Sequence, residues 1–142
     1  MGKEKLLRDY LLSVKNSPFE WGKHDCLIFT NDAFRSMYGE GYADDWLGRY
    51  MSENKPLLPS QLKKEFGYNT FDEAISKRLR EINYVPPKGS LVATRKVNRW
   101  AIGYGLGISL GLKCAFLAEF GIVYVPVEEV DKAWVRVDEN SI

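Results

Sequence analysis

The stretch Phe19–Phe29 carries the residues whose types and spacing suit covalent chemistry. It reads F-E-W-G-K-H-D-C-L-I-F, and it places the only histidine of the chain, His24, two residues before Cys26. A cysteine enzyme needs a base that takes up the thiol proton, and an imidazole commonly does so. The stretch therefore makes Cys26 the candidate nucleophile and His24 its candidate base, with Asp25 between them.

The pattern of apolar residues predicts that Cys26 opens a helix. Asp25 can cap this helix, and Gly39 can end it. Unpaired N–H groups in a first helical turn favour negative charge, so they lower the pKa of a thiol placed there. Residues two apart do not face each other on a helix. His24 therefore reaches Cys26 only if the chain turns sharply before Asp25.

Each residue of the motif also has a structural interpretation. Cys26 is either a nucleophile or a small buried hydrophobe, since free cysteines are usually buried. His24 is either the base or a ring that binds a loop carbonyl or a carboxylate and fixes the turn. Asp25 is better explained as a helix cap than as an acid, although its carboxylate would raise the pKa of the neighbouring thiol. A disulfide between Cys26 and Cys114 stays open.

The remaining pattern predicts an α+β fold, with helices packed on a small antiparallel sheet or half-barrel. Trp100 follows a basic stretch and is the candidate for an exposed aromatic side chain. The expected helices are Lys3–Lys15, the helix after Asp25, a short one around Trp46, one capped by Ser60 that ends at Gly67, and one with a Thr70–Glu73 capping box that runs to Leu79. The expected strands are Ser90–Thr94, Trp100–Leu110, Lys113–Glu119, Ile122–Val125 and Ala133–Val137.

Composition limits the classes of function. The 142 residues, 45% of them apolar, fit a single domain that covers positions 1–142. Twenty basic residues against nineteen acidic ones leave a net charge of +1, which gives no overall field for nucleic acid or anionic lipid. No apolar run could span a membrane and no signal peptide is visible, so we expect a chain made as a soluble cytosolic protein. Two cysteines and one histidine do not complete a zinc site, and neither a metal nor a cofactor is expected.

Several of these motifs, in this order, resemble the NlpC/P60 branch of the papain-like cysteine hydrolases. The resemblance covers most of the chain and implies a papain-like fold, Cys26 as nucleophile, and peptide bonds of bacterial peptidoglycan as the substrate. Trp21, Gly22, Asp25 and Gly105 are the motif residues for which we expect a structural role. The motifs that carry the resemblance are Trp21-Gly22, Asp25-Cys26, Pro87–Val92 (P-K-G-S-L-V) and Gly105–Gly111 (G-L-G-I-S-L-G).

The chain is also similar to small phage and prophage proteins of this superfamily that are encoded among tail genes and share W-G-x-H-D-C. This similarity implies a chain made in the bacterial cytoplasm, located in the virion tail and bound to other tail proteins. One position departs from the enzymes, because their strand motif begins with the base histidine where this chain has Gly105. Two functions remain: a cysteine peptidase or amidase acting through Cys26, with a base in cis or from a neighbouring chain, or a catalytically inactive component of a tail tip or baseplate.

Overall fold

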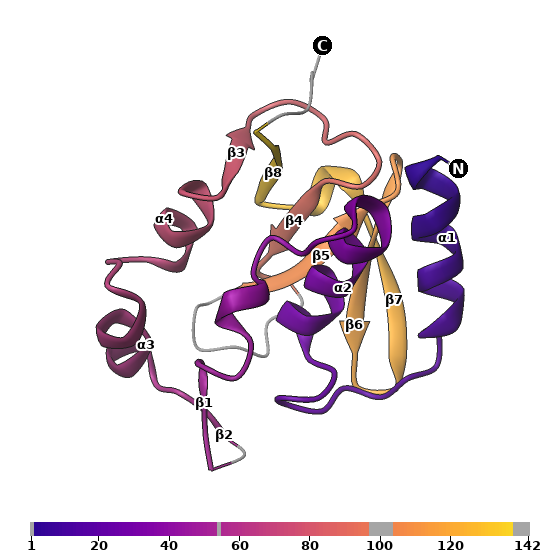
Figure 1. The fold of residues 1–142 in the computed structure, drawn as a ribbon. Helices are drawn as coiled ribbons and strands as arrows, with labels where there is room; N and C mark the ends of the chain where they lie inside the picture. The colour runs from indigo at the N-terminus through magenta and orange to yellow at the C-terminus, as the bar shows by residue number, and fades with distance from the viewer. Residues whose placement is uncertain (1, 54, 97–103, 138–142) are drawn as a thin grey trace.

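Helices cover one face of an antiparallel sheet in the computed structural model, which describes residues 2–53, 55–96 and 104–137 (Figure 1). The α+β class predicted from the sequence is confirmed. The helical elements are α1 (Lys3–Ser13), α2 (Cys26–Tyr38), the 3-10 helix η1 (Asp44–Trp46), α3 (Pro59–Phe66), α4 (Phe71–Ser76) and the 3-10 helix η2 (Val127–Glu129). The strands are β1 (Met51–Ser52), β2 (Lys55–Pro56), β3 (Leu79–Ile82), β4 (Leu91–Thr94), β5 (Gly105–Ser109), β6 (Lys113–Ala118), β7 (Gly121–Pro126) and β8 (Lys132–Arg136).

Six strands pair in the order β3-β8-β4-β5-β6-β7, and every pairing is antiparallel. Strands β4 to β7 are neighbours in sequence as well as in space, whereas β8 returns to lie between β3 and β4. Helix α2 packs against β5, and α1 lies beside β7 at one end of the sheet (Figure 1). The sheet thus presents its middle strands to the helix that Cys26 opens.

Alternation along β5 decides which of its residues meet the helices. Leu106 and Ile108 are buried in the same apolar cluster as Cys26, so their side chains lie on the helix-covered face. Positions 105 and 107 therefore project to the opposite face. At Gly107 an added Cβ would come within 2.5 Å of a backbone oxygen on β6, so this strand pair requires a glycine there. A side chain at Gly105 would likewise point away from Cys26.

Most of the predicted elements are present. Helix α2 has the predicted cap at Asp25 and ends at Gly39, whose φ of 85° suits a residue without a Cβ. The short helix expected at Trp46 is confirmed as η1. The five predicted strands correspond to β4 to β8, although the first part of the second one, including Trp100, lies outside the described residues.

Three predicted helix boundaries are wrong. The first helix ends at Ser13, two residues before the expected Lys15. Ser60 does not cap α3, because Pro59 already occupies the first helical position, where its missing N–H is not needed. Thr70 caps α4 as predicted, its Oγ1 accepting from the Glu73 N–H at 3.2 Å, but the helix ends at Ser76. Leu79 instead begins β3, since pairing with β8 buries it and outweighs the local helical spacing.

Candidate functional site

Cys26 lies at the first position of α2, facing the middle of the sheet. Only 5% of the residue is exposed, and it belongs to the cluster that also contains Leu106 of β5. A backbone hydrogen bond from Leu106 reaches the thiol. The predicted helix start is therefore correct, and the thiol is packed between the helix and the sheet.

Burial dominates the electrostatics of this thiol. Desolvation, together with the adjacent Asp25 carboxylate, raises the pKa of Cys26 to about 12. Backbone N–H groups of the first turn of α2 act in the opposite direction, as the sequence predicts, but their effect is smaller. The net shift is upward, so the expected lowering of the thiol pKa by the helix N-terminus is not found.

Asp25 is completely buried and holds three parts of the chain together. Its Oδ1 accepts from the Ile28 N–H at 3.0 Å, which caps α2, and its Oδ2 accepts from the Gly22 N–H at 2.9 Å. The Tyr50 hydroxyl donates to Oδ2 at 2.5 Å and comes from the segment between α2 and α3. The carboxylate thus ties the opening turn, the helix and a distant segment to one another, which is a structural role.

The Trp21-Gly22 turn is explained by the same contacts. Gly22 has a φ of 81°, which favours glycine, and this conformation aims its N–H at Asp25. The Trp21 ring packs edge-on against Phe19 at 5.0 Å between centroids. Both residues of the turn therefore serve the geometry that caps α2.

His24 lies in this turn, and its Nε2 atom neither acts as a base for Cys26 nor makes a hydrogen bond that fixes the turn. Nε2 is buried and has no hydrogen-bond partner among the described residues, so it binds neither the Cys26 sulfur nor a carbonyl or carboxylate. Its ring packs edge-on against Phe29 at 6.2 Å between centroids. Burial lowers the pKa of His24, although the Asp32 and Asp25 carboxylates oppose that shift. The ring is therefore poorly placed to be protonated.

The strand that faces Cys26 supplies no ionisable group in place of the missing histidine. Leu106 is the β5 residue at the thiol, and Gly105 projects from the other face of the sheet. On β6, the residues on the helix side are Ala115 and Leu117, which are both apolar. Apolar side chains of β5 and β6 thus line the sheet side of the thiol.

Cys114 and Cys26 are both free and both buried. They belong to different apolar clusters, Cys26 to the one under the helices and Cys114 to the one on the far side of the sheet. Burial raises the pKa of Cys114 to about 11. Because the sheet separates them, the two thiols do not form the disulfide that the sequence left open.

Tyr50 is a neighbour of Asp25 at this site that no sequence pattern indicates. It is fully buried, and burial and the Asp25 carboxylate raise the pKa of its hydroxyl. A further buried hydrogen bond joins the hydroxyls of Tyr42 and Thr30 at 2.8 Å. Tyr42 comes from the same irregular segment as Tyr50, and Thr30 comes from α2. No local pattern reveals such contacts, because the partners are separated by 12 and 25 residues.

Neither a metal-ligand cluster nor a membrane-spanning helix is found among the described residues. In these ranges no three His, Cys, Asp or Glu side chains come together in a group that could hold a metal ion. No helix in the same ranges is both long and apolar enough to cross a membrane.

Comparison with known proteins adds a family without an assigned activity. A family model described as "Domain of unknown function (DUF6950)" matches residues 2–136, which is nearly the whole chain. No curated protein matches the chain.

Proposed function

We propose, for a chain that belongs to the DUF6950 family, a non-catalytic structural role in a phage or prophage tail, carried by a papain-like fold of the NlpC/P60 type. The tail assignment and the papain-like fold are supported by the sequence resemblance of the W-G-x-H-D-C motif and the Gly105–Gly111 strand motif. The helix-on-antiparallel-sheet arrangement, with a cysteine at the start of a buried helix, is compatible with that fold. The fold then acts as a scaffold for assembly with other tail proteins.

The observation that carries the non-catalytic assignment is the burial of Cys26. With a pKa of about 12, on the order of one thiol in 10⁵ would be ionised at pH 7. The thiolate is the reactive form of cysteine, and a general base would have to compensate for this deficit. Neither Nε2 of His24 nor the facing residues of β5 and β6 provides one.

The polar residues of the motif support the same role. Asp25 has its hydrogen bonds directed to Gly22, Ile28 and Tyr50, all within the protein. A motif shared with hydrolases can therefore persist because it builds the turn and the helix cap. Peptidase activity on peptidoglycan would instead require that Cys26 becomes exposed and meets an imidazole.

Alkylation by iodoacetamide tests this proposal directly. We would measure the rate at Cys26 across pH in a Cys114→Ser variant, under native conditions and in urea, and repeat it with His24→Ala. We expect slow native alkylation that is at least about a hundredfold faster after unfolding, and no dependence on His24. A Cys26→Ser variant, in which only Cys114 reacts, is the matched control for a buried thiol.

Two results would contradict the proposal. If the native apparent pKa of Cys26 falls below about 8.5 and rises in His24→Ala, the site is an activated nucleophile and assays on peptidoglycan peptides become appropriate. For the tail assignment, mass spectrometry of purified virions should detect the chain among the tail proteins, and its absence there would refute that part.

A further inference from the structure

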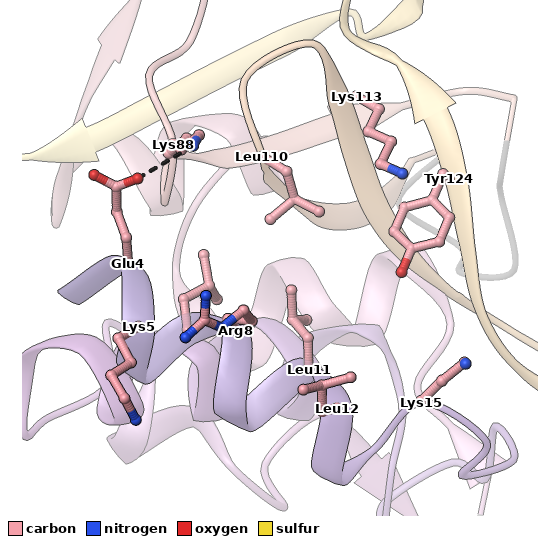
Figure 2. Close-up of a pocket in the computed structure, with 11 residues that line it drawn as sticks. Glu4, Lys5, Arg8, Leu11, Leu12, Lys15, Lys88, Leu110, Lys113 and Tyr124 are labelled. Atoms are coloured by element: carbon pink, nitrogen blue, oxygen red, sulfur yellow. Dashed lines mark ion pairs between the residues drawn. The ribbon is translucent and has the colours of Figure 1, made fainter. Parts of the chain in front are cut away.

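A groove lies between α1 and the hairpin that joins β5 to β6, away from Cys26. Figure 2 shows Leu110, from the sheet side, opposite Leu11 of α1 across this hollow. Leu12, which is 64% exposed, and Tyr124 of β7, which is 49% exposed, extend the apolar lining. The hollow has a volume of about 430 Å³, so it can accept a large apolar side chain.

The charges around this groove are strongly one-sided. Five basic side chains line it against a single acidic one, Glu4, although the whole chain has a net charge of only +1. Positive charge therefore gathers at this groove, although the composition of the whole chain is nearly balanced. The basic residues are Lys5, Arg8, Lys15, Lys88 and Lys113.

Only some of these cations are neutralised within the protein. Lys88 pairs with Glu4 at 3.2 Å (Figure 2), and Lys5 pairs with Asp9 at 2.8 Å. Among the described residues, neither Arg8 nor Lys15 forms an ion pair. The Lys113 ammonium lies 4.2 Å from the centre of the Tyr124 ring, a contact that leaves its positive charge in place (Figure 2). Three cations thus surround an apolar floor without a carboxylate at ion-pair distance, although the hydrogen bond from Lys5 and, to a smaller extent, the charge of Arg8 lower the pKa of Asp9.

A second hollow continues the first along the surface. The two share Lys88, Leu110 and Lys113 as lining residues, and the second has a volume of about 780 Å³. Its outer wall includes Val85 and Leu112, which are 71% and 88% exposed. We call the two hollows together the basic groove. Apolar side chains line both of its ends, and Lys88 and Lys113 lie between them.

We propose that the basic groove binds an acidic, extended peptide segment of a partner protein. Carboxylates of the segment pair with Arg8, Lys15 and Lys113, and apolar side chains of the same segment enter the two hollows. The charge of the rim selects an anion, while the exposed Leu12 and Leu112 select a ligand with apolar groups at two separate points. A polypeptide that mixes acidic and apolar residues carries both features.

Other arrangements fit the surface less well. A nucleic acid offers phosphates but no aliphatic groups for the leucine-lined floor, and a flat lipid surface does not enter a hollow between a helix and a hairpin. Addition of a strand to β7 is hindered, because the segment before α2 already bonds there, with Ile122 N–H donating to the Lys15 carbonyl at 3.1 Å. Side chains in the groove therefore make the contact. This proposal does not depend on the role of Cys26.

The test uses fluorescence anisotropy of a labelled synthetic peptide in which aspartate and glutamate alternate with leucine and phenylalanine. We expect saturable binding to the intact chain that weakens as salt rises. The double variant Arg8→Glu/Lys113→Glu should reduce the affinity at least about tenfold. Lys64→Glu, an equally exposed reversal on α3, is the matched control and should leave the affinity unchanged. Circular dichroism establishes that each variant is folded.

A second experiment tests whether apolar side chains of the peptide enter the hollows. Leu12→Ser with Leu112→Ser should weaken binding of the same peptide, and both positions are exposed enough for the fold to survive. A peptide with asparagine and glutamine in place of its acids should not bind. Equal binding of that neutral peptide, or unchanged affinity in the Arg8→Glu/Lys113→Glu variant, would overturn the proposal. So would tighter binding to phosphatidylglycerol vesicles or to a single-stranded oligonucleotide that the double variant loses, because the groove would then serve lipid or nucleic acid. None of these binding results bears on the alkylation test of Cys26, so the two proposals can fail independently.

Discussion

The Cys26 site and the basic groove use their polar groups in opposite ways. At Cys26 the nearby polar atoms are turned inward, with Asp25 fully buried and bonded to the Tyr50 hydroxyl. At the groove Arg8 and Lys15 line an open hollow and form no ion pair with a described carboxylate. The first region has residue types typical of catalysis in a closed environment, and the second has ordinary residue types around an open one.

The contrast shows that residue type and environment must agree before a site can act. Burial and the Asp25 carboxylate raise the pKa of the Cys26 thiol, and both effects favour a packing role for this side chain. Lysines and leucines at helical spacing look like an ordinary amphipathic helix. They become a candidate binding surface because Lys113 at the start of β6 and Lys88 in the turn before β4 lie across the groove from that helix. Three sets of measurements test this contrast.

Removal of the Asp25 carboxylate should have the largest effect. Asp25→Ala leaves the Ile28 N–H uncapped and the buried Tyr50 hydroxyl without its acceptor, so we expect a loss of about 3 kcal/mol in the free energy of unfolding. Thr70→Ala removes an exposed cap at α4 and should cost about 1 kcal/mol. Urea unfolding followed by circular dichroism measures both. Equal losses would mean that the motif is not the structural centre described above.

Two neighbouring leucines of α1 sharpen the description of the groove. Leu11 is 8% exposed and part of the core, so Leu11→Ala should cost about 2–3 kcal/mol of stability. Leu12 is 64% exposed at the groove, and Leu12→Ala should change stability by less than about 0.5 kcal/mol. The same unfolding measurement applies. A large loss at Leu12 would show that this side chain serves folding and is not reserved for a ligand.

A small effect on stability is expected from the protonation of His24. Its pKa is lowered in the folded chain, so the unfolded chain takes up a proton first as the pH falls. Stability should therefore be complete above the unfolded value of about 6.5 and decrease as the pH falls through it toward the lower folded pKa. Because the ring is only partly buried, we expect less than about 1 kcal/mol, and His24→Gln should remove it. Unfolding midpoints in urea at about pH 7.5 and about pH 5.5 measure the difference. If the wild-type chain is instead more stable at about pH 5.5 than at about pH 7.5, the pKa of His24 is not lowered by folding.

The sequence was a good guide wherever a local signal decides the structure. Asp25 before Cys26 and Gly39 after Tyr38 predict both ends of α2, because capping needs only neighbouring residues. The alternating segments likewise predict β4 to β8. Leu79 is the informative failure, since its spacing from α4 is helical and only pairing with β8 makes it a strand residue.

The candidate site was less predictable for the same physical reason. The sequence by itself determined that a cysteine stands at the start of a capped helix, and that no second histidine exists to serve it. Only the tertiary structure decided that β5 covers the thiol with Leu106, that Tyr50 binds Asp25, and that the basic residues of α1 line one groove with Lys88 and Lys113. Caps and alternation depend on interactions a few residues apart, whereas burial, pKa and charge density depend on groups brought together from the whole chain.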